Sequence, residues 1–278
     1  MSLTVFLSVL AAALLHATWN ALVRVGASRI GTMMVLSGAQ GLIGLAVAAT
    51  QTVPAGAVWP WLVASGAIHS AYKIFLTFAY EHGDLSRVYP LARGTAPMIT
   101  LLVGALWLGE IVAPAEAGGI LLLGAGILLL ARGVWTSGES RRMLPFAFGS
   151  ACATAGYTLV DGLGARLAEN ASVFVGWLFV IDGVIFAAVM LGLRGRSSLP
   201  SGGKVWLTGS LAAAASYGSY AVAVWAMTLA PIALVAALRE TSILFAVLIG
   251  WLVFRERMTP AKAISVGLIV CGVILTRL

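Results

Sequence analysis

The sequence predicts an all-α, polytopic membrane protein with about ten transmembrane helices, arranged as two inverted five-helix repeats around a central cavity. The chain of 278 residues is 60% hydrophobic and only 10% charged, whereas a soluble domain carries about 25% charged residues. Continuously apolar runs of about 20 residues recur along its whole length, as transmembrane helices require. In addition, residues of the first half recur in register in the second half.

The internal repeat becomes visible when the sequence is shifted by 146 residues, which brings Arg93 onto Arg239. Without any gap, the same shift pairs Thr95 with Thr241, Gly104 with Gly250, Glu110 with Glu256, Pro114 with Pro260, Ala117 with Ala263 and Gly126 with Gly272. In each copy an apolar helix ends in a short turn with a glutamate, and the proline begins the next helix. We therefore expect a single membrane domain, 1–278, built from repeats 1–135 and 142–278.

Each repeat contains five of the apolar runs. The expected spans are 3–23, 32–50, 58–80, 85–108, 114–131, 145–165, 171–193, 204–228, 231–254 and 260–276. Because five is an odd number, the two repeats insert in opposite orientations, and Glu110 and Glu256 lie on opposite faces of the membrane. Such an inverted repeat lets one central site open alternately to either side.

Lysine and arginine in the joints between the spans indicate the orientation of the chain. The joints on one side carry twelve of them, and those on the other side carry only Arg166 and Arg277. We therefore expect a multi-pass protein of a bacterial-type inner membrane with both termini extracytoplasmic. The net charge of +7 is spread singly or in pairs among these joints, so lipid is the expected surrounding and nucleic acid is not an expected partner.

Polar residues inside the spans indicate a site, because an ionisable group at mid-helix costs about 2.5–3.5 kcal/mol on insertion scales. The candidates for the substrate cavity are His16, Trp19, Asn20, His69, Tyr72, Lys73, Tyr89, Arg93, Tyr157, Asp161, Ser216, Tyr217, Tyr220 and Arg239. Their cations, carboxylates and aromatic rings suit a zwitterionic solute with an apolar side chain.

Structural interpretations remain open for several of these residues. His16 and Asn20 can form a hydrogen-bond pair between helices, and Arg93 and Arg239 can extend from helix ends to the headgroups. Glu110 and its repeat counterpart are expected in turns on a wet surface rather than as proton carriers. The choice between a structural and a functional role stays open for Lys73, Asp182 and Glu240.

The fourth span carries Pro90 and Pro97, seven residues apart and on nearly one face. Each removes a backbone hydrogen bond and weakens the helix. We expect a kink at which a gate could bend, or whose freed carbonyls could bind a solute. A static bend that fits the bundle is the alternative.

Motifs of catalysis are absent from the sequence: it contains no GxxxxGK[ST], HExxH or GxSxG motif and no paired-cysteine spacing. Cys152 and Cys271 lie far apart in apolar runs, where helix packing is their expected role. We therefore expect no enzyme activity, no metal and no cofactor, and transport would have to be driven by a gradient.

Four stretches of this chain resemble the drug/metabolite transporter superfamily, in particular its EamA-type members. These stretches are HATWNALVR at 16–24, YPLARGTAP at 89–97, LGE at 108–110 followed by Pro114, and FRE at 254–256 followed by Pro260. The resemblance implies ten helices in two inverted bundles, a central cavity walled by spans 1, 3, 4, 6, 8 and 9, and peripheral fifth and tenth spans. Members of this superfamily export amino acids and other small metabolites, or move sugars, nucleotide sugars or cationic drugs.

We therefore expect a gradient-driven exporter of amino acids, aromatic ones included, or of related small amphipathic metabolites, working as a monomer or homodimer. The coupling ion, whether a proton or another ion, is left open. A carrier of drugs or of lipid-linked or nucleotide sugars is the alternative within transport. Outside transport, the alternatives are an integral-membrane enzyme using His16, His69 and Asp161, and a sensor or assembly subunit.

Overall fold

The computed structural model describes residues 1–25, 28–82, 85–130, 142–253, 255 and 258–277, and these form helices and short connections without a strand. The helices are α1 (Leu3–Val25), α2 (Arg29–Ala49), α3 (Trp59–His82), α4 (Leu85–Trp107), α5 (Pro114–Leu130), α7 (Met143–Leu167), α8 (Ala171–Arg194), α9 (Gly203–Met227), α10 (Ile232–Arg239), α11 (Ser242–Leu252) and α12 (Pro260–Leu275). Two 3₁₀ turns, η1 (Gly56–Val58) and η2 (Gly195–Ser198), precede α3 and follow α8. The expected all-helical, polytopic class is confirmed.

Five helical stretches of the described chain are long and apolar enough to cross a membrane by length and composition. They are Leu3–Val23, Ile30–Ala49, Met143–Leu167, Ala171–Ser198 and Ile232–Leu252. α5 and α12 are also apolar but shorter, and both begin at the prolines that the repeat pattern placed at the start of a helix.

The ninth expected span, 231–254, differs from the prediction because it contains two helices. α10 ends at Arg239 and α11 begins at Ser242, with Glu240 and Thr241 in a turn between them. The Thr241 hydroxyl donates to the Leu238 carbonyl oxygen at 2.7 Å, and the Thr241 N–H donates to the same oxygen at 3.1 Å. These three-residue bonds replace the four-residue ladder of the α-helix and interrupt it.

α4, which occupies the corresponding place in the first repeat, is helical without interruption from Leu85 to Trp107. Its helix therefore continues through Pro90 and Pro97. The break in this pair of spans lies in α10–α11 instead. The expected role of the two prolines in gating stays a prediction.

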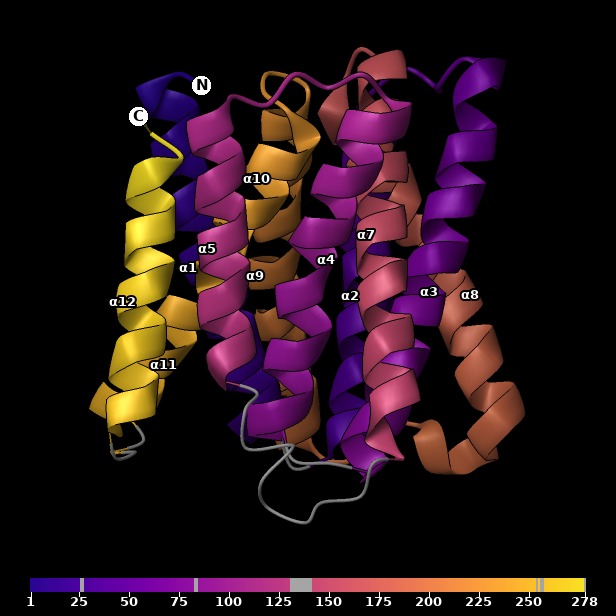
Figure 1. The fold of residues 1–278 in the computed structure, drawn as a ribbon. Helices are drawn as coiled ribbons and strands as arrows, with labels where there is room; N and C mark the ends of the chain where they lie inside the picture. Colours follow the sequence, from indigo (N-terminus) through magenta and orange to yellow (C-terminus); the bar gives the residue numbers. More distant parts are fainter. Residues whose placement is uncertain (26–27, 83–84, 131–141, 254, 256–257, 278) are drawn as a thin grey trace.

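The helices run up and down a single bundle, with both termini at the same end (Figure 1). The connection from α4 to α5, which contains Glu110, lies at that end. α11 ends and α12 begins at the opposite end, and α5 and α12 lie at the periphery, as the resemblance implied (Figure 1). Glu256 itself lies outside the described residues.

Helix contacts follow a twofold pattern. α2 packs on α8 and α5 on α12, so each of these helices contacts its own counterpart in the other half. α1 packs on α9, and the counterparts of these two helices in the other half, α7 and α3, also pack on each other. These pairings support two inverted repeats around a shared axis.

Glycines make the closest of these contacts possible. A Cβ added to Gly44 of α2 would fall on the carbonyl oxygen of Gly176 in α8, and one added to Gly119 of α5 would lie 2.7 Å from the carbonyl oxygen of Gly272 in α12. In both contacts, α2 with α8 and α5 with α12, the two backbones therefore touch directly, as small residues allow between membrane helices.

The turn after the duplicated helix is also repeated. Gly109 follows α4 with a φ of +61°, and its repeat counterpart Arg255 follows α11 with a φ of +54°. This left-handed conformation is easy for glycine and costly for arginine. Its recurrence at the same repeat position supports a duplicated helix–turn–helix unit.

Candidate functional site

A cavity lies between helices of both halves. Its atom-free space is about 460 Å³, the open mouth included, while the room for the centre of a water molecule is about 40 Å³, enough for a few waters. It is lined by His16, Trp19, Met33, Leu36, Gln40, His69, Tyr72, Lys73, Tyr157, Phe179, Ser216, Tyr220 and Arg239. Nine of the residues expected at the substrate cavity from the sequence are therefore brought together.

The remaining candidates do not line the cavity in the part of the chain that the structure describes, or their side chains lie outside that part. Asp161 and Arg93 contact lining residues from behind, as described below. Asn20 donates its amide to the His16 backbone oxygen at 2.8 Å within α1, so the expected hydrogen bond to another helix is not made by this contact. Tyr217 packs on Phe179, with ring centroids 5.4 Å apart. The side chains of Tyr89 and Pro90 lie outside the described residues.

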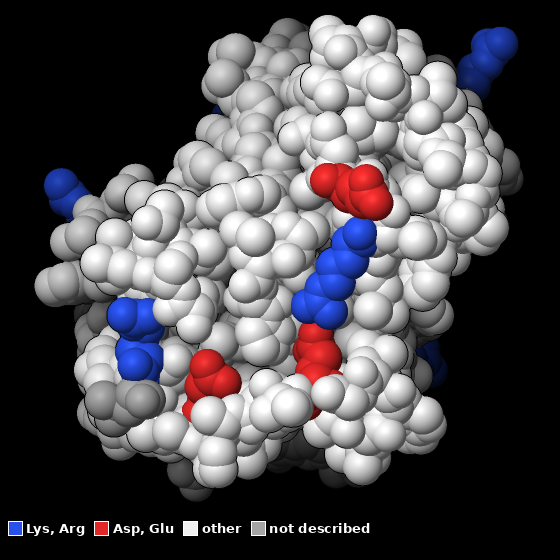
Figure 2. Space-filling view, turned by 90° about the horizontal axis from the view of Figure 1, so that it is seen from above, with Lys and Arg blue, Asp and Glu red and all other residues white. Residues whose placement is uncertain are grey.

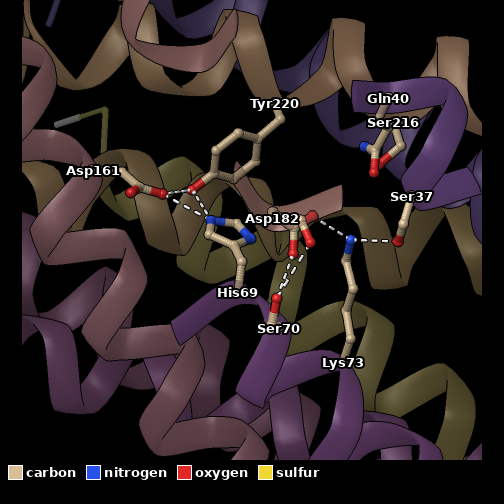
Figure 3. Close-up of polar contacts among 9 residues, drawn as sticks. All are labelled: Ser37, Gln40, His69, Ser70, Lys73, Asp161, Asp182, Ser216 and Tyr220. Carbon is tan, nitrogen blue, oxygen red and sulfur yellow. Dashed lines mark hydrogen bonds and ion pairs between the residues drawn. The ribbon is translucent and has the colours of Figure 1, made fainter. Parts of the chain in front are cut away.

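Asp161 of α7 anchors the first polar cluster, which Figure 3 shows in close-up. The carboxylate is fully buried, and its Oδ2 accepts from the Tyr220 hydroxyl and lies 2.9 Å from Nε2 of His69. The His69 ring stacks on Tyr157 with centroids 4.0 Å apart. Asp161 therefore fixes two lining side chains, from α3 and α9, without facing the cavity itself.

Lys73 of α3 and Asp182 of α8 form the second cluster (Figure 3). The Lys73 ammonium lies 2.5 Å from Asp182 Oδ2 and donates to the Ser37 hydroxyl at 2.8 Å, while the Ser70 hydroxyl donates to Asp182 Oδ1 at 3.1 Å. Lys73 and Asp182 therefore form an ion pair between α3 and α8. This ion pair also accounts for Asp182, on a span that the family resemblance did not assign to the cavity.

The third polar cluster consists of Arg93 of α4, Glu240 of the α10–α11 turn, and His16 and Trp19 of α1. Arg93 donates through Nε to Glu240 Oε2 at 2.9 Å, and its Nη2 lies 3.3 Å from Nε2 of His16. The indole N–H of Trp19 donates to Nδ1 of the same imidazole at 3.2 Å. Arg93 is 1% exposed and Arg239 5% exposed. The alternative that these arginines extend from helix ends to the headgroups is wrong, because carboxylate and aromatic partners hold them inside the bundle.

Glu110 has a structural place at the end of the bundle where the termini lie. Its carboxylate accepts from the Ile232 N–H at the start of α10, at 3.0 and 3.1 Å, and from Arg166 Nη2 at 3.0 Å. An anion suits the N-terminus of a helix. Glu110 thus ties the turn after α4 to α7 and α10, in keeping with its expected role as a turn residue.

The walls of the cavity differ from those that the family resemblance implied. α2 contributes Met33, Leu36 and Gln40, and α8 contributes Phe179, whereas none of the described side chains of α4 lines the cavity. α4 instead borders a smaller neighbouring cavity through Ala96, Pro97 and Thr100, together with Thr154, Thr158, Ala236, Arg239 and Glu240. α2 and α8 are themselves in close contact, through Gly44 and Gly176.

Of the lining residues that the sequence did not indicate, Gln40 had a usable signal. It is a polar side chain inside an apolar span, and its amide donates to the Ser216 hydroxyl at 3.0 Å (Figure 3). Met33, Leu36 and Phe179 carried no signal, because apolar residues in an apolar span do not report which face they occupy. Within the described residues, no group of three or more His, Cys, Asp or Glu side chains could hold a metal ion.

Comparison with known proteins gives a family match for just under half of the chain and a similar fold for nearly all of it. Residues 141–278 match the EamA-like transporter family. A solved structure, described only as the crystal structure of a protein, is similar to 99% of this chain and 98% of its own, with a TM-score of 0.78 at 21% identity. That likeness shows the fold alone, and no curated protein matches. The comparisons therefore show a match to the EamA-like transporter family over residues 141–278 and a similar fold over nearly the whole chain.

Proposed function

We propose that the whole chain is a secondary, gradient-driven transporter that exports amino acids, aromatic ones included, by alternating access through the cavity. The observation that carries the proposal is the cavity itself, which is buried between the two halves and lined by aromatic and charged side chains. A membrane interior tolerates such groups where they face one another or a solute.

The charges around the cavity favour a solute of zero net charge. Among the described residues, the buried cations are Lys73, Arg93 and Arg239, and the buried carboxylates are Asp161, Asp182 and Glu240. These three cations and three carboxylates balance one another, so a bound ion of either sign would leave the site unbalanced. A zwitterion adds no net charge but offers both signs, and the rings of Trp19 and Tyr157 can face an ammonium or an apolar side chain.

The inverted arrangement supports alternating access. We propose that 1–135 and 142–278 are inverted repeats, on the basis of the paired helix contacts, so that one central site between them can open to either side when the halves rock. The cavity in this conformation is too narrow for an amino acid, which is consistent with a closed stage of such a cycle.

We further propose that both termini are extracytoplasmic in an inner membrane. The end of the bundle with the termini shows few Lys and Arg side chains among mostly uncharged residues (Figure 2). At the opposite end the described chain exposes Arg142, Arg194, Arg196, Lys204 and Arg255. Basic residues favour the cytoplasmic side.

Transport by the purified chain in proteoliposomes tests the function. We expect labelled leucine and phenylalanine to exchange into vesicles preloaded with the unlabelled amino acid, without chemical change. Ser216→Trp should abolish this exchange by filling the cavity. Leu211→Trp, on the same helix but 51% exposed, should leave it intact and serves as the control.

Other results would redirect the proposal. Exchange of drugs or nucleotide sugars without amino acids would favour the other carriers of the superfamily. Conversion of the solute would indicate an integral-membrane enzyme. Equal exchange by wild type and Ser216→Trp would remove the cavity from the transport path.

A further inference from the structure

Arg239 is a buried cation that lacks a carboxylate partner among the described residues. Lys73 lies 2.5 Å from Asp182 and Arg93 lies 2.9 Å from Glu240, whereas Arg239 has no ion pair within the described residues. Its guanidinium lies over the Tyr220 ring, 4.9 Å from the centroid. The Nε of Arg239 is buried and has no hydrogen-bond partner among the described residues. A buried N–H without an acceptor is costly.

His16 shows a second shortage of acceptors in the same cavity. The Trp19 indole approaches one ring nitrogen at 3.2 Å and the Arg93 guanidinium the other at 3.3 Å. Indole and guanidinium groups only donate, and a neutral imidazole accepts at one nitrogen while its other nitrogen carries a proton. Whichever tautomer is present, two donors therefore face each other at one of these contacts. A protonated ring would leave donors opposed at both.

The two shortages point to the same missing group. Arg239 and His16 both line the central cavity, and the carboxylate of Glu240, next to Arg239 in the chain, already accepts from Arg93. A carboxylate in the cavity would supply two acceptor oxygens, and arginine binds carboxylates with two parallel N–H donors. Asp182 and Glu240 already accept from Lys73 and Arg93, so a carboxylate of the solute would supply the acceptor that Arg239 lacks.

We propose that Arg239 binds the carboxylate of the transported solute, with the His16 imidazole as a second donor. This inference rests on the proposed function and assigns one end of its substrate. The α10–α11 break positions the anchor, because α10 ends at Arg239 and the following turn places Glu240 against Arg93. The ring of Tyr220, held by Asp161, supports the guanidinium from below, so Asp161 acts as a positioning residue.

Three related ligands test the anchor through competition with labelled phenylalanine in proteoliposomes. They are phenylalanine, phenethylamine, which lacks the carboxylate, and 3-phenylpropionate, which lacks the ammonium. Wild type should bind phenylalanine most tightly. Arg239→Gln should weaken phenylalanine and phenylpropionate by about 10–100-fold, the loss expected for hydrogen bonds to a charged group, and should leave phenethylamine unchanged. Arg196→Gln, which removes an exposed arginine, should change none of them.

A purely structural role of Arg239 gives a different pattern. If Arg239→Gln weakens all three ligands equally, or wild type binds phenethylamine as tightly as phenylalanine, the anchor is overturned. Arg239→Lys keeps the charge without the fork, so it should retain the preference for carboxylates at reduced affinity. This variant carries the test if the glutamine variant fails to fold.

Failure of the proposed function is distinguishable from failure of the anchor. Transport of carboxylate-free solutes alone would overturn the anchor and keep a transporter. If no amino acid is transported, the amino-acid function falls, and thermal stabilisation of the purified chain by phenylpropionate decides the anchor. Stabilisation of wild type but not of Arg239→Gln would support it, and stabilisation of neither would overturn it.

Discussion

Glu240→Ala is expected to destabilise the folded protein by about 3–5 kcal/mol, the cost of leaving one member of a buried ion pair without its partner. Arg93 is 1% exposed and Glu240 3% exposed, and 2.9 Å separate their charged atoms. Removing the carboxylate leaves two buried guanidinium groups, from Arg93 and Arg239, close to one imidazole. Thermal unfolding of the purified protein in one detergent measures the loss.

The double variant Arg93→Met with Glu240→Leu is the matched control. Replacing both members of a buried ion pair by apolar residues of similar volume is often neutral or stabilising. We expect it to recover most of the lost stability. A single variant that unfolds at the wild-type temperature, or a double variant as unstable as the single, would show that this pair does not stabilise the fold.

Gly44→Ala is expected to destabilise the bundle, by about 1–3 kcal/mol for an overpacked contact and more if α2 and α8 separate. The added methyl group would fall on the carbonyl oxygen of Gly176, a backbone atom that cannot rotate away. Because α2 carries lining residues of the cavity, transport should fall together with stability. Unfolding temperature and amino-acid exchange measure the two effects.

Gly38→Ala is the control on the same helix. No atom lies within 4 Å of the place its Cβ would take, and alanine is the better helix former by about 0.5–1 kcal/mol. This variant should be as stable as wild type or slightly more so. Equal behaviour of the two variants would mean that the glycine contact between α2 and α8 is not close in solution.

The spans and the candidate cavity could be predicted from the sequence because the membrane simplifies the physics. A polar side chain in an apolar span faces the bundle interior rather than lipid. The sequence therefore indicated His16, His69, Tyr157 and Tyr220 as cavity residues without knowledge of the packing. The identity of the partners was not predictable in the same way. Glu240 pairs with Arg93, 147 positions away, and no local pattern specifies such a contact.

Two features escaped prediction for different reasons. At the interruption, the Thr241 hydroxyl competes with backbone N–H groups for the Leu238 carbonyl oxygen. A threonine in an apolar span does not by itself indicate whether the helix breaks there. The participation of α2 and α8 in the cavity depends on how these apolar helices pack, with Gly44 of one close to Gly176 of the other. Hydropathy reports that such helices exist but not which pairs of them touch.

Alternating accessibility of the cavity tests the central claim most directly. Ser216 lines the cavity, and a single cysteine placed there, in a chain whose exposed Cys152 and Cys271 are replaced by alanine, can be labelled by a membrane-impermeant thiol reagent. Cysteines at Val53 and Ser197, exposed at opposite ends of the bundle, mark the two sides. The account predicts labelling of the Ser216→Cys variant from each side in turn, and protection by excess amino acid. Labelling from neither side, or from one side under every condition, would contradict it.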